Sequence, residues 1–197
     1  MLRGHDRQLP AMTSTATRHS PATKRWTYAD YCRIPADGKR HEILDGRHFV
    51  NPAPSPYHQF VSGSLYAQLR ARIQDTGRGL VLSAPVDVHL ASGTIVQPDI
   101  VVVRGRTRPI SGATKIRVVP DLLVEVLSPS TRRHDQHRKR ERYERAGVRE
   151  YWLVDPEAQS IKQLVLRKGV YVALATATAS ITLRICRGIT LDLANVW

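Results

Sequence analysis

Apolar residues are concentrated in several short runs along the chain, and these runs predict the strands of a buried sheet. Two of them are nearly continuous, residues 94–103 (TIVQPDIVVV) and residues 120–129 (PDLLVEVLSP). Short runs of Val, Ile and Leu bounded by turn-forming residues are typical of strands that are covered on both faces. Residues 79–90 and 148–156 predict two more strands, and residues 160–175 predict a hairpin, which is followed by a short terminal element.

Helical periodicity replaces these runs in two places. Between residues 58 and 75 the apolar positions recur at spacings of one, three or four and form one stripe, which comprises Phe60, Val61, Leu65, Leu69 and Ile73. Residues 133–146 are highly charged and end at Gly147, a residue type preferred just beyond a helix C-terminus. We expect a helix in each place.

The first part of the chain adds a short helix and a hairpin. Thr27 is a suitable N-cap for a helix within residues 26–34. Residues 40–51 predict two short strands joined at Asp45-Gly46, a strong hairpin dipeptide.

The order of these elements predicts the fold class. After the first hairpin, the coarse order over residues 26–197 is helix, strand, strand, strand, helix, strand, which indicates a single α/β domain with a central mixed sheet flanked by helices. The strands at about 95–103 and 120–127 are expected to be neighbours in that sheet. Residues 1–25 show no hydrophobic periodicity, so they predict a disordered basic tail.

Two acidic residues lie inside strands that are otherwise apolar, Asp99 and Glu125. An isolated carboxylate is costly to bury, so such residues are usually paired, hydrogen-bonded or bound to a metal. Each alone could cap a turn or pair with an arginine. Two carboxylates that converge from neighbouring strands repel each other unless a cation lies between them, and oxygen ligands of this kind suit Mg²⁺ or Mn²⁺.

The charged helix offers a cation to these acids. Side chains two apart in a strand share a face, so Leu127 follows Glu125 on the same side. In the helix, Asp135, Lys139 and Tyr143 are spaced four apart and lie on one face. Lys139 is therefore expected to lean back over Glu125, although a solvated position on an arginine-rich face is the alternative.

The overall charge favours a polyanionic partner. The chain has 30 Lys and Arg against 17 Asp and Glu, a formal net charge of +13. Basic side chains bind nucleic acid by displacing condensed counterions from phosphates, although the excess could also serve solubility. The cysteines, Cys32 and Cys186, have no disulfide or zinc spacing, and no apolar run approaches the about 20 residues that cross a bilayer. These features predict a cytoplasmic protein without a membrane segment.

Several longer motifs resemble one protein family. HEILDGRHFVNPAPSPYHQ, APVDV, VQPDIVVV, PDLLVEVLSPSTRRHD, YERAGVREYWLVDP and the closing LDLANVW are similar to the Uma-type restriction endonucleases of the PD-(D/E)XK nuclease superfamily. The resemblance covers about residues 26–197. It implies a restriction-endonuclease-like fold with an acid on each of two adjacent strands and a lysine that has moved to the following helix.

Matched residue by residue, the resemblance implies an active site of Asp99, Glu125, Lys139 and Glu42. The three acids would surround a Mg²⁺ or Mn²⁺ ion. Glu42 matches the glutamate of the family's hairpin, although His41 stands where tyrosine is usual. A strand-end ion pair with Arg40 or Lys39 is the alternative for Glu42.

The resulting hypothesis is a metal-dependent endonuclease that hydrolyses DNA, with double-stranded DNA as partner and a homodimer as the assembly. A basic loop, residues 104–117, and the tail are expected to hold phosphates without reading bases. The alternatives are a non-catalytic nucleic-acid- or partner-binding protein of the same fold, and a metal hydrolase for small phosphoesters. The roles of His58 and Asp135 stay open, Asp155 is interpreted as a turn residue, and the remaining histidines as surface residues.

Overall fold

The structure is a computed structural model that describes residues 24–91, 93–105, 113–129, 132 and 134–197, without the side chain of His134. Most of the expected tail and the middle of the basic loop lie outside the described residues. The helices and strands are, in chain order, α1 Tyr28–Tyr31, β1 Arg40–Leu44, β2 Arg47–Asn51, α2 Pro56–Leu69, the π-helix η1 Arg70–Gln74, β3 Gly79–Ser83, β4 Val88–Ala91, β5 Thr94–Val96, β6 Ile100–Arg104, β7 Leu122–Val126, the π-helix η2 His134–Lys139, α3 Arg140–Ala146, β8 Glu150–Asp155, β9 Ser160–Arg167, β10 Val170–Ala173, β11 Ser180–Thr182 and β12 Thr190–Asp192.

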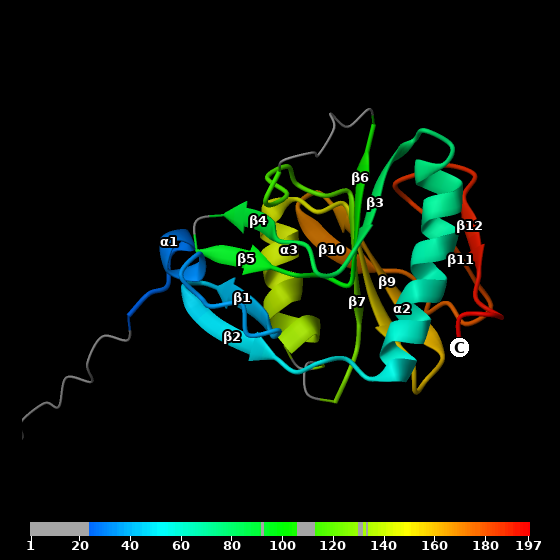
Figure 1. Cartoon of the computed structure of the whole chain (residues 1–197). Helices are drawn as coiled ribbons and strands as arrows, with labels where there is room; N and C mark the ends of the chain where they lie inside the picture. Colours follow the sequence, from blue (N-terminus) through cyan, green and yellow to red (C-terminus); the bar gives the residue numbers. More distant parts are fainter. Residues whose placement is uncertain (1–23, 92, 106–112, 130–131, 133) are drawn as a thin grey trace, which may run out of the picture.

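A six-stranded sheet forms the centre of the fold (Figure 1), with its strands in the order β10-β9-β8-β7-β6-β3. β7 and β8 run parallel and the other neighbouring pairs are antiparallel, so the sheet is mixed, as predicted. β6 and β7 are neighbours, and Ile100 pairs with Val124. The predicted adjacency of these two strands is confirmed.

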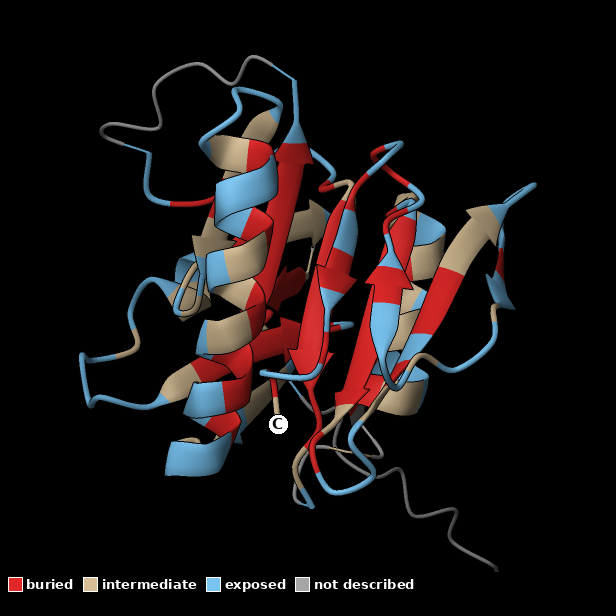
Figure 2. Cartoon of the chain, turned by 90° about the vertical axis from the view of Figure 1, so that its right-hand side faces the viewer, coloured by how far each residue is buried: buried red, intermediate tan, exposed pale blue. Residues whose placement is uncertain are grey.

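Different elements cover the two faces of this sheet, because alternate residues of each strand point to opposite sides. On one face, Ile100, Val124 and Trp152 belong to a core that includes the buried stripe of α2 and the β11–β12 hairpin. On the other face, Val101 and Leu123 pack with α3 and with the four-stranded sheet β2-β1-β5-β4. Figure 1 shows α2 on one side and α3 with the small sheet on the other, and Figure 2 shows the central strands buried along most of their length. The predicted α/β fold is confirmed.

The apolar stripe of α2 is confirmed with one exception. Ser55 caps the helix by accepting a hydrogen bond from the backbone N–H of His58 at 3.2 Å. The fully buried members of the stripe are Val61, Leu65, Leu69 and Ile73. Phe60 is 53% exposed, so its assignment to the stripe was wrong; it lies about 100° around the helix from Val61. Neither α2 nor any other helix in the described residues is long and apolar enough to span a membrane.

Two segments that were expected to be single strands are each divided between two sheets. Residues 94–103 form β5 in the four-stranded sheet and then β6 in the six-stranded sheet, whereas residues 79–90 form β3 in the six-stranded sheet and then β4 in the four-stranded sheet. Pro98 and Pro85 lie at the breaks. Proline has no N–H to donate to a ladder, so it is disfavoured inside a sheet. Asp99 therefore lies just before β6 rather than inside a strand.

Candidate active site

Asp99 is held at the start of β6 by groups from three other elements. Its Oδ2 accepts a hydrogen bond from the backbone N–H of Val126 at 2.8 Å and lies 3.3 Å from His58 Nε2. Its Oδ1 accepts a hydrogen bond from Arg40 at 2.9 Å. Burial would raise the pKa of the Asp99 carboxyl, but the hydrogen bond from His58 and the charge of Arg40 outweigh it and hold the pKa below its usual range.

Glu125 lies opposite Asp99 on the neighbouring strand β7. Ile100 pairs with Val124 in the antiparallel ladder, so continuing this register by one residue aligns Asp99 with Glu125. Residues that are opposite each other in a ladder lie on the same face of the sheet. The fold thus brings the two acids that the sequence singled out to the same place.

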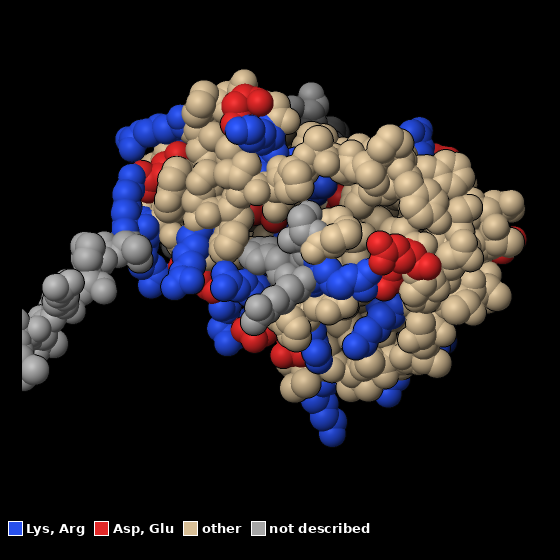
Figure 3. All heavy atoms as spheres, turned by 90° about the horizontal axis from the view of Figure 1, so that it is seen from below, with Lys and Arg blue, Asp and Glu red and all other residues tan. Residues whose placement is uncertain are grey.

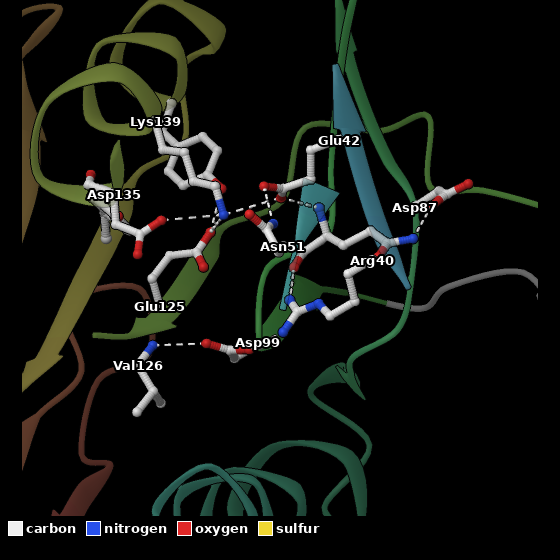
Figure 4. A network of polar contacts seen from close by, with 12 residues as sticks. Arg40, Glu42, Asn51, Asp87, Asp99, Glu125, Val126, Asp135 and Lys139 are labelled. Carbon is white, nitrogen blue, oxygen red and sulfur yellow. Dashed lines mark hydrogen bonds and ion pairs between the residues drawn. The ribbon is translucent and has the colours of Figure 1, made fainter. Parts of the chain in front are cut away.

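Lys139 reaches Glu125 from the helical segment that follows β7, as predicted. Its Nζ lies 3.0 Å from Glu125 Oε1, 3.0 Å from Glu42 Oε1 and 3.3 Å from Asp135 Oδ1. Figure 4 shows this amine at the centre of three carboxylates. Only 3% of the Lys139 side chain is exposed, so the alternative of a solvated lysine is wrong.

The helical segment that carries Lys139 buries a polar face. Asp135 and Lys139 lie in η2, and π-helical turns often occur at functional sites. Tyr143, in the following α-helix, is fully buried and donates a hydrogen bond to Glu125 Oε1 at 2.6 Å. The predicted common face of these three residues is confirmed, and it packs on the acid-bearing strand.

Glu42 is a completely buried partner of Lys139. Its Oε1 also accepts a hydrogen bond from the backbone N–H of Gln97 at 2.7 Å, and its Oε2 accepts one from Asn51 at 2.8 Å. Burial would raise the pKa of Glu42, but the charge of Lys139 and these hydrogen bonds outweigh it and lower the pKa. Arg40, the alternative partner for Glu42, pairs with Asp99 instead.

The cluster contains more acids than cations. Its ionisable members, apart from His58, are the acids Glu42, Asp99, Glu125 and Asp135 and the cations Lys139 and Arg40. Four negative charges against two positive charges leave two uncompensated when all are ionised. Burial raises the pKa of Glu125 well above its usual range, and the charges of Asp135 and the other acids add to this rise against the opposing charge of Lys139. Burial would lower the pKa of Lys139, but the surrounding carboxylates raise it well above its usual range, so this amine stays protonated.

Asp99 and Glu125 line one cavity of about 220 Å³, together with Asn51, His58 and Lys139. In the described part of the chain, no three His, Cys, Asp or Glu side chains are arranged so that they could hold a metal ion together. Mg²⁺ is nevertheless commonly bound through only one or two carboxylates, with water and substrate phosphates as the other ligands. A divalent cation would also match the two uncompensated charges. The donor set of Asp99 and Glu125 therefore fits such an ion.

Three polar residues of the site were missed or left without a role in the sequence. His58 Nε2 lies 3.0 Å from the carbonyl oxygen of Val126, so it joins α2 to the end of β7. Arg40 also donates to the carbonyl oxygen of Gln97, and Asn51 pairs with Arg40 in the β1–β2 ladder. One signal could have found Arg40, because it lies two residues before Glu42 and thus on the same side of the strand.

Two minor expectations have different outcomes. His41 was expected at the surface but is buried. Its Nδ1 lies 2.9 Å from His48 Nε2, and its Nε2 lies 2.9 Å from Asp37 Oδ1. Asp155 was interpreted as a turn residue but is the last residue of β8, and its Oδ1 accepts a hydrogen bond from the backbone N–H of Ala158 in the following turn at 3.2 Å.

Comparisons with known proteins agree with this architecture. Residues 28–194 match the family model described as "Uma2: Putative restriction endonuclease". The fold is similar to a crystal structure described as "a putative nuclease belonging to DUF820 from Anabaena variabilis ATCC 29413". The two share a TM-score of 0.71 and 15% sequence identity, over 86% of this chain and 96% of that chain. At this identity the likeness concerns the fold alone. Among curated proteins, no sequence matches the chain.

Proposed function

Since the chain belongs to the Uma2 family, whose description is "putative restriction endonuclease", we propose that it is a metal-dependent endonuclease that hydrolyses phosphodiester bonds in double-stranded DNA. The observation that carries this proposal is the placement of Asp99, just before β6, opposite Glu125 on the neighbouring strand β7, with the buried Lys139 bonded to Glu125. Asp99 and Glu125 are the proposed ligands of a Mg²⁺ or Mn²⁺ ion. Such an ion, when bound, polarises the phosphate and lowers the pKa of a coordinated water.

The protein's own groups have distinct parts in this proposal. Lys139 stays protonated, so it stabilises negative charge at the phosphate and does not remove a proton from water. Glu42 holds Lys139 in place; it is completely buried and does not line the cavity of Asp99 and Glu125, so we assign it this positioning role instead of the ion-binding role that the resemblance implies. His58 orients the Asp99 carboxylate and the Val126 carbonyl from the first turn of α2.

The charge distribution supports a nucleic-acid substrate. Figure 3 views the molecule from the side on which the β2–α2 connection and the end of β7 lie in Figure 1. Lys and Arg side chains gather there over the half formed by the small sheet and α3, whereas the half beneath α2 and β11–β12 is largely uncharged. A positive surface on one side of the cavity would bind the phosphates of a nucleic acid and bring its backbone to an ion held by Asp99 and Glu125.

A cleavage assay tests this function. Supercoiled plasmid is expected to be nicked or linearised in the presence of Mg²⁺ and to remain intact with EDTA. Raising the salt concentration from 50 to 200 mM should weaken DNA binding by about 10³-fold or more if six to ten phosphates are contacted. Hydrolysis of bis(p-nitrophenyl) phosphate without any nucleic-acid cleavage would favour a small-phosphoester hydrolase, and binding without cleavage would favour a non-catalytic protein.

We also propose a homodimer, because two copies of the site can act on the two strands of a duplex. Sedimentation of the purified protein with and without a short duplex measures this directly. A monomer in both conditions would contradict it.

The raised pKa of Glu125 predicts a pH-dependent effect of Mg²⁺ on stability. The contribution of Glu125 to the stability of the ion-free protein is complete below its ordinary pKa of 4.5 and declines as the pH rises toward the folded pKa. Asp99 and Glu42, whose pKa values are lowered, lose their contributions only as the pH falls below the ordinary values of 3.8 and 4.5. Mg²⁺ should therefore stabilise the protein increasingly between about pH 5 and pH 8.

Thermal unfolding measures this effect. At about one hundred times its Kd, Mg²⁺ is expected to raise the Tm at pH 8 by roughly 5–10 °C. Glu125→Gln should remove the Mg²⁺ effect and should not lower the Tm in EDTA, because it mimics the neutral carboxyl. An equal Mg²⁺ effect in this variant would show that the ion binds elsewhere.

A further inference from the structure

A second hollow adjoins the active-site cavity, and we refer to it as the α2 groove. Its volume is about 350 Å³, and the residues that line it include Arg40, Gln59, Ser62, Gly63, Tyr66 and Ser83. Arg40, Pro54 and Asp99 line both the α2 groove and the active-site cavity. The groove therefore begins at the proposed ion-binding acid and continues between the middle of α2 and the end of β3.

The lining of the α2 groove combines three kinds of group. Gln59, Ser62 and Ser83 offer uncharged donors and acceptors, and Tyr66 is a partly buried aromatic ring that packs on the main core. Arg40 supplies a positive charge at the end near Asp99. Hydroxyl and amide groups, an aromatic ring and a guanidinium are the side chains that bind the base, sugar and phosphate of an unpaired nucleotide.

Arg40 carries a separate indication of a ligand. Its terminal nitrogens donate to Asp99 and to the carbonyl oxygen of Gln97. Its Nε is buried, and within the described residues it has no hydrogen-bond partner. A buried N–H of a guanidinium is costly to leave unpaired, so an acceptor that enters the groove at this point would be bound favourably.

Gly63 keeps the α2 groove open. It lies in the middle of α2, where glycine lowers helix stability relative to alanine, and it needs no special backbone conformation there. A Cβ built at Gly63 meets no atom within 4 Å, so the space beside it is open. The residue type that costs helix stability thus lines the α2 groove at a position where a larger side chain has free space to occupy.

We propose that the α2 groove binds one nucleotide of the strand being cleaved, next to the phosphate at Asp99 and Glu125, with its phosphate near Arg40 and its base against Tyr66. The volume lies at the lower end of the range of about 300–1,000 Å³ for small-ligand sites, which suits a single nucleotide rather than a duplex. The duplex would have to open locally for this nucleotide to enter. This inference rests on the proposed nuclease function.

Filling the groove tests the proposal. Gly63→Phe places a ring in open space, and Tyr66→Leu keeps an apolar contact with the core while removing the flat aromatic surface. Each variant is expected to bind a fluorescent oligothymidylate at least about fivefold more weakly than the parent in Ca²⁺, the scale of losing one stacked base. Cleavage of the oligonucleotide with Mg²⁺ should fall more than hydrolysis of bis(p-nitrophenyl) phosphate, which is too small to need the groove.

Ala71→Phe is the matched control, because it adds the same ring at an exposed position further along the same helical segment and does not line the groove. Melting temperatures confirm that each variant is folded. If the parent cleaves nucleic acid and both groove variants bind and cleave like Ala71→Phe, the groove proposal is overturned while the nuclease function stands. If the parent cleaves no phosphodiester, the nuclease function fails, and a loss of oligonucleotide binding confined to the groove variants still supports the nucleotide site.

Discussion

Asp99→Asn and Glu125→Gln are each expected to lower Mg²⁺-dependent DNA cleavage by at least about 10³-fold, the scale of losing a principal charge-stabilising group in an active site. Both substitutions preserve the size of the side chain and remove a charge that would hold the ion. Initial rates of plasmid nicking at saturating Mg²⁺ measure the effect, and fluorescence anisotropy in Ca²⁺ measures DNA affinity separately. The affinity should be largely retained, because neither carboxylate contributes positive charge to the binding surface.

Glu141→Gln is the matched control for these two variants. Glu141 lies on α3, is exposed and does not line the cavity, so its variant should cut at the parent rate. Rates for Asp99→Asn and Glu125→Gln that both equal the control rate would remove these residues from the mechanism. The binding-only protein would then become the better interpretation.

The parts of the site that depend on local geometry could be predicted from the sequence. In β7, the period of two places Glu125 on one face, and in the following helix the spacing of four places Asp135, Lys139 and Tyr143 on another. Once the helix packs on the strand, the face that carries Lys139 contacts the face that carries Glu125, and the sequence periods alone are enough to predict this. The contacts of Lys139 and Tyr143 with Glu125 follow from this.

The contributions of the small sheet could not be predicted in the same way. Arg40 and Asp99 are 59 residues apart, and their contact depends on how the β1–β2 hairpin sits against the end of the six-stranded sheet. Pro98 divides one apolar run between the two sheets, which places Asp99 at their junction. No local period indicates which carboxylate an arginine from a distant strand will meet.

Glu150 shows that an acid in an apolar strand is not by itself a sign of an active site. It is fully buried on β8, next to β7. Its oxygens accept hydrogen bonds from the side chains of Trp152 and Gln163 and from the backbone N–H groups of Arg184 and Ile185. The two backbone donors tie the C-terminal segment to the sheet. Glu125 differs because its partners are a charged lysine and other acids beside a cavity, a distinction that only tertiary structure reveals.

Lys139→Met is expected to destabilise the protein by about 3–5 kcal/mol, the usual cost of leaving buried charges without their partner. The Tm should fall by roughly 10 °C or more in a domain of this size. The reason is that Glu42, Glu125 and Asp135 all share this one buried amine. Cleavage by the folded fraction should also fall by about 10²–10³-fold, as for the loss of one charge-stabilising donor.

Two further variants separate charge from packing in this prediction. Lys162→Met removes the same ammonium at an exposed position and should leave the Tm near that of the parent. At pH 8 the double variant Lys139→Met/Glu125→Gln should recover part of the lost stability, because position 125 can then no longer carry a negative charge beside Glu42 and Asp135. The destabilisation by Lys139→Met should also shrink as the pH falls toward 5, since carboxyls that have lost their cation take up protons more readily. A loss of Tm that is independent of pH and unchanged in the double variant would mean that Lys139 acts through packing, and its electrostatic role at Glu125 would be rejected.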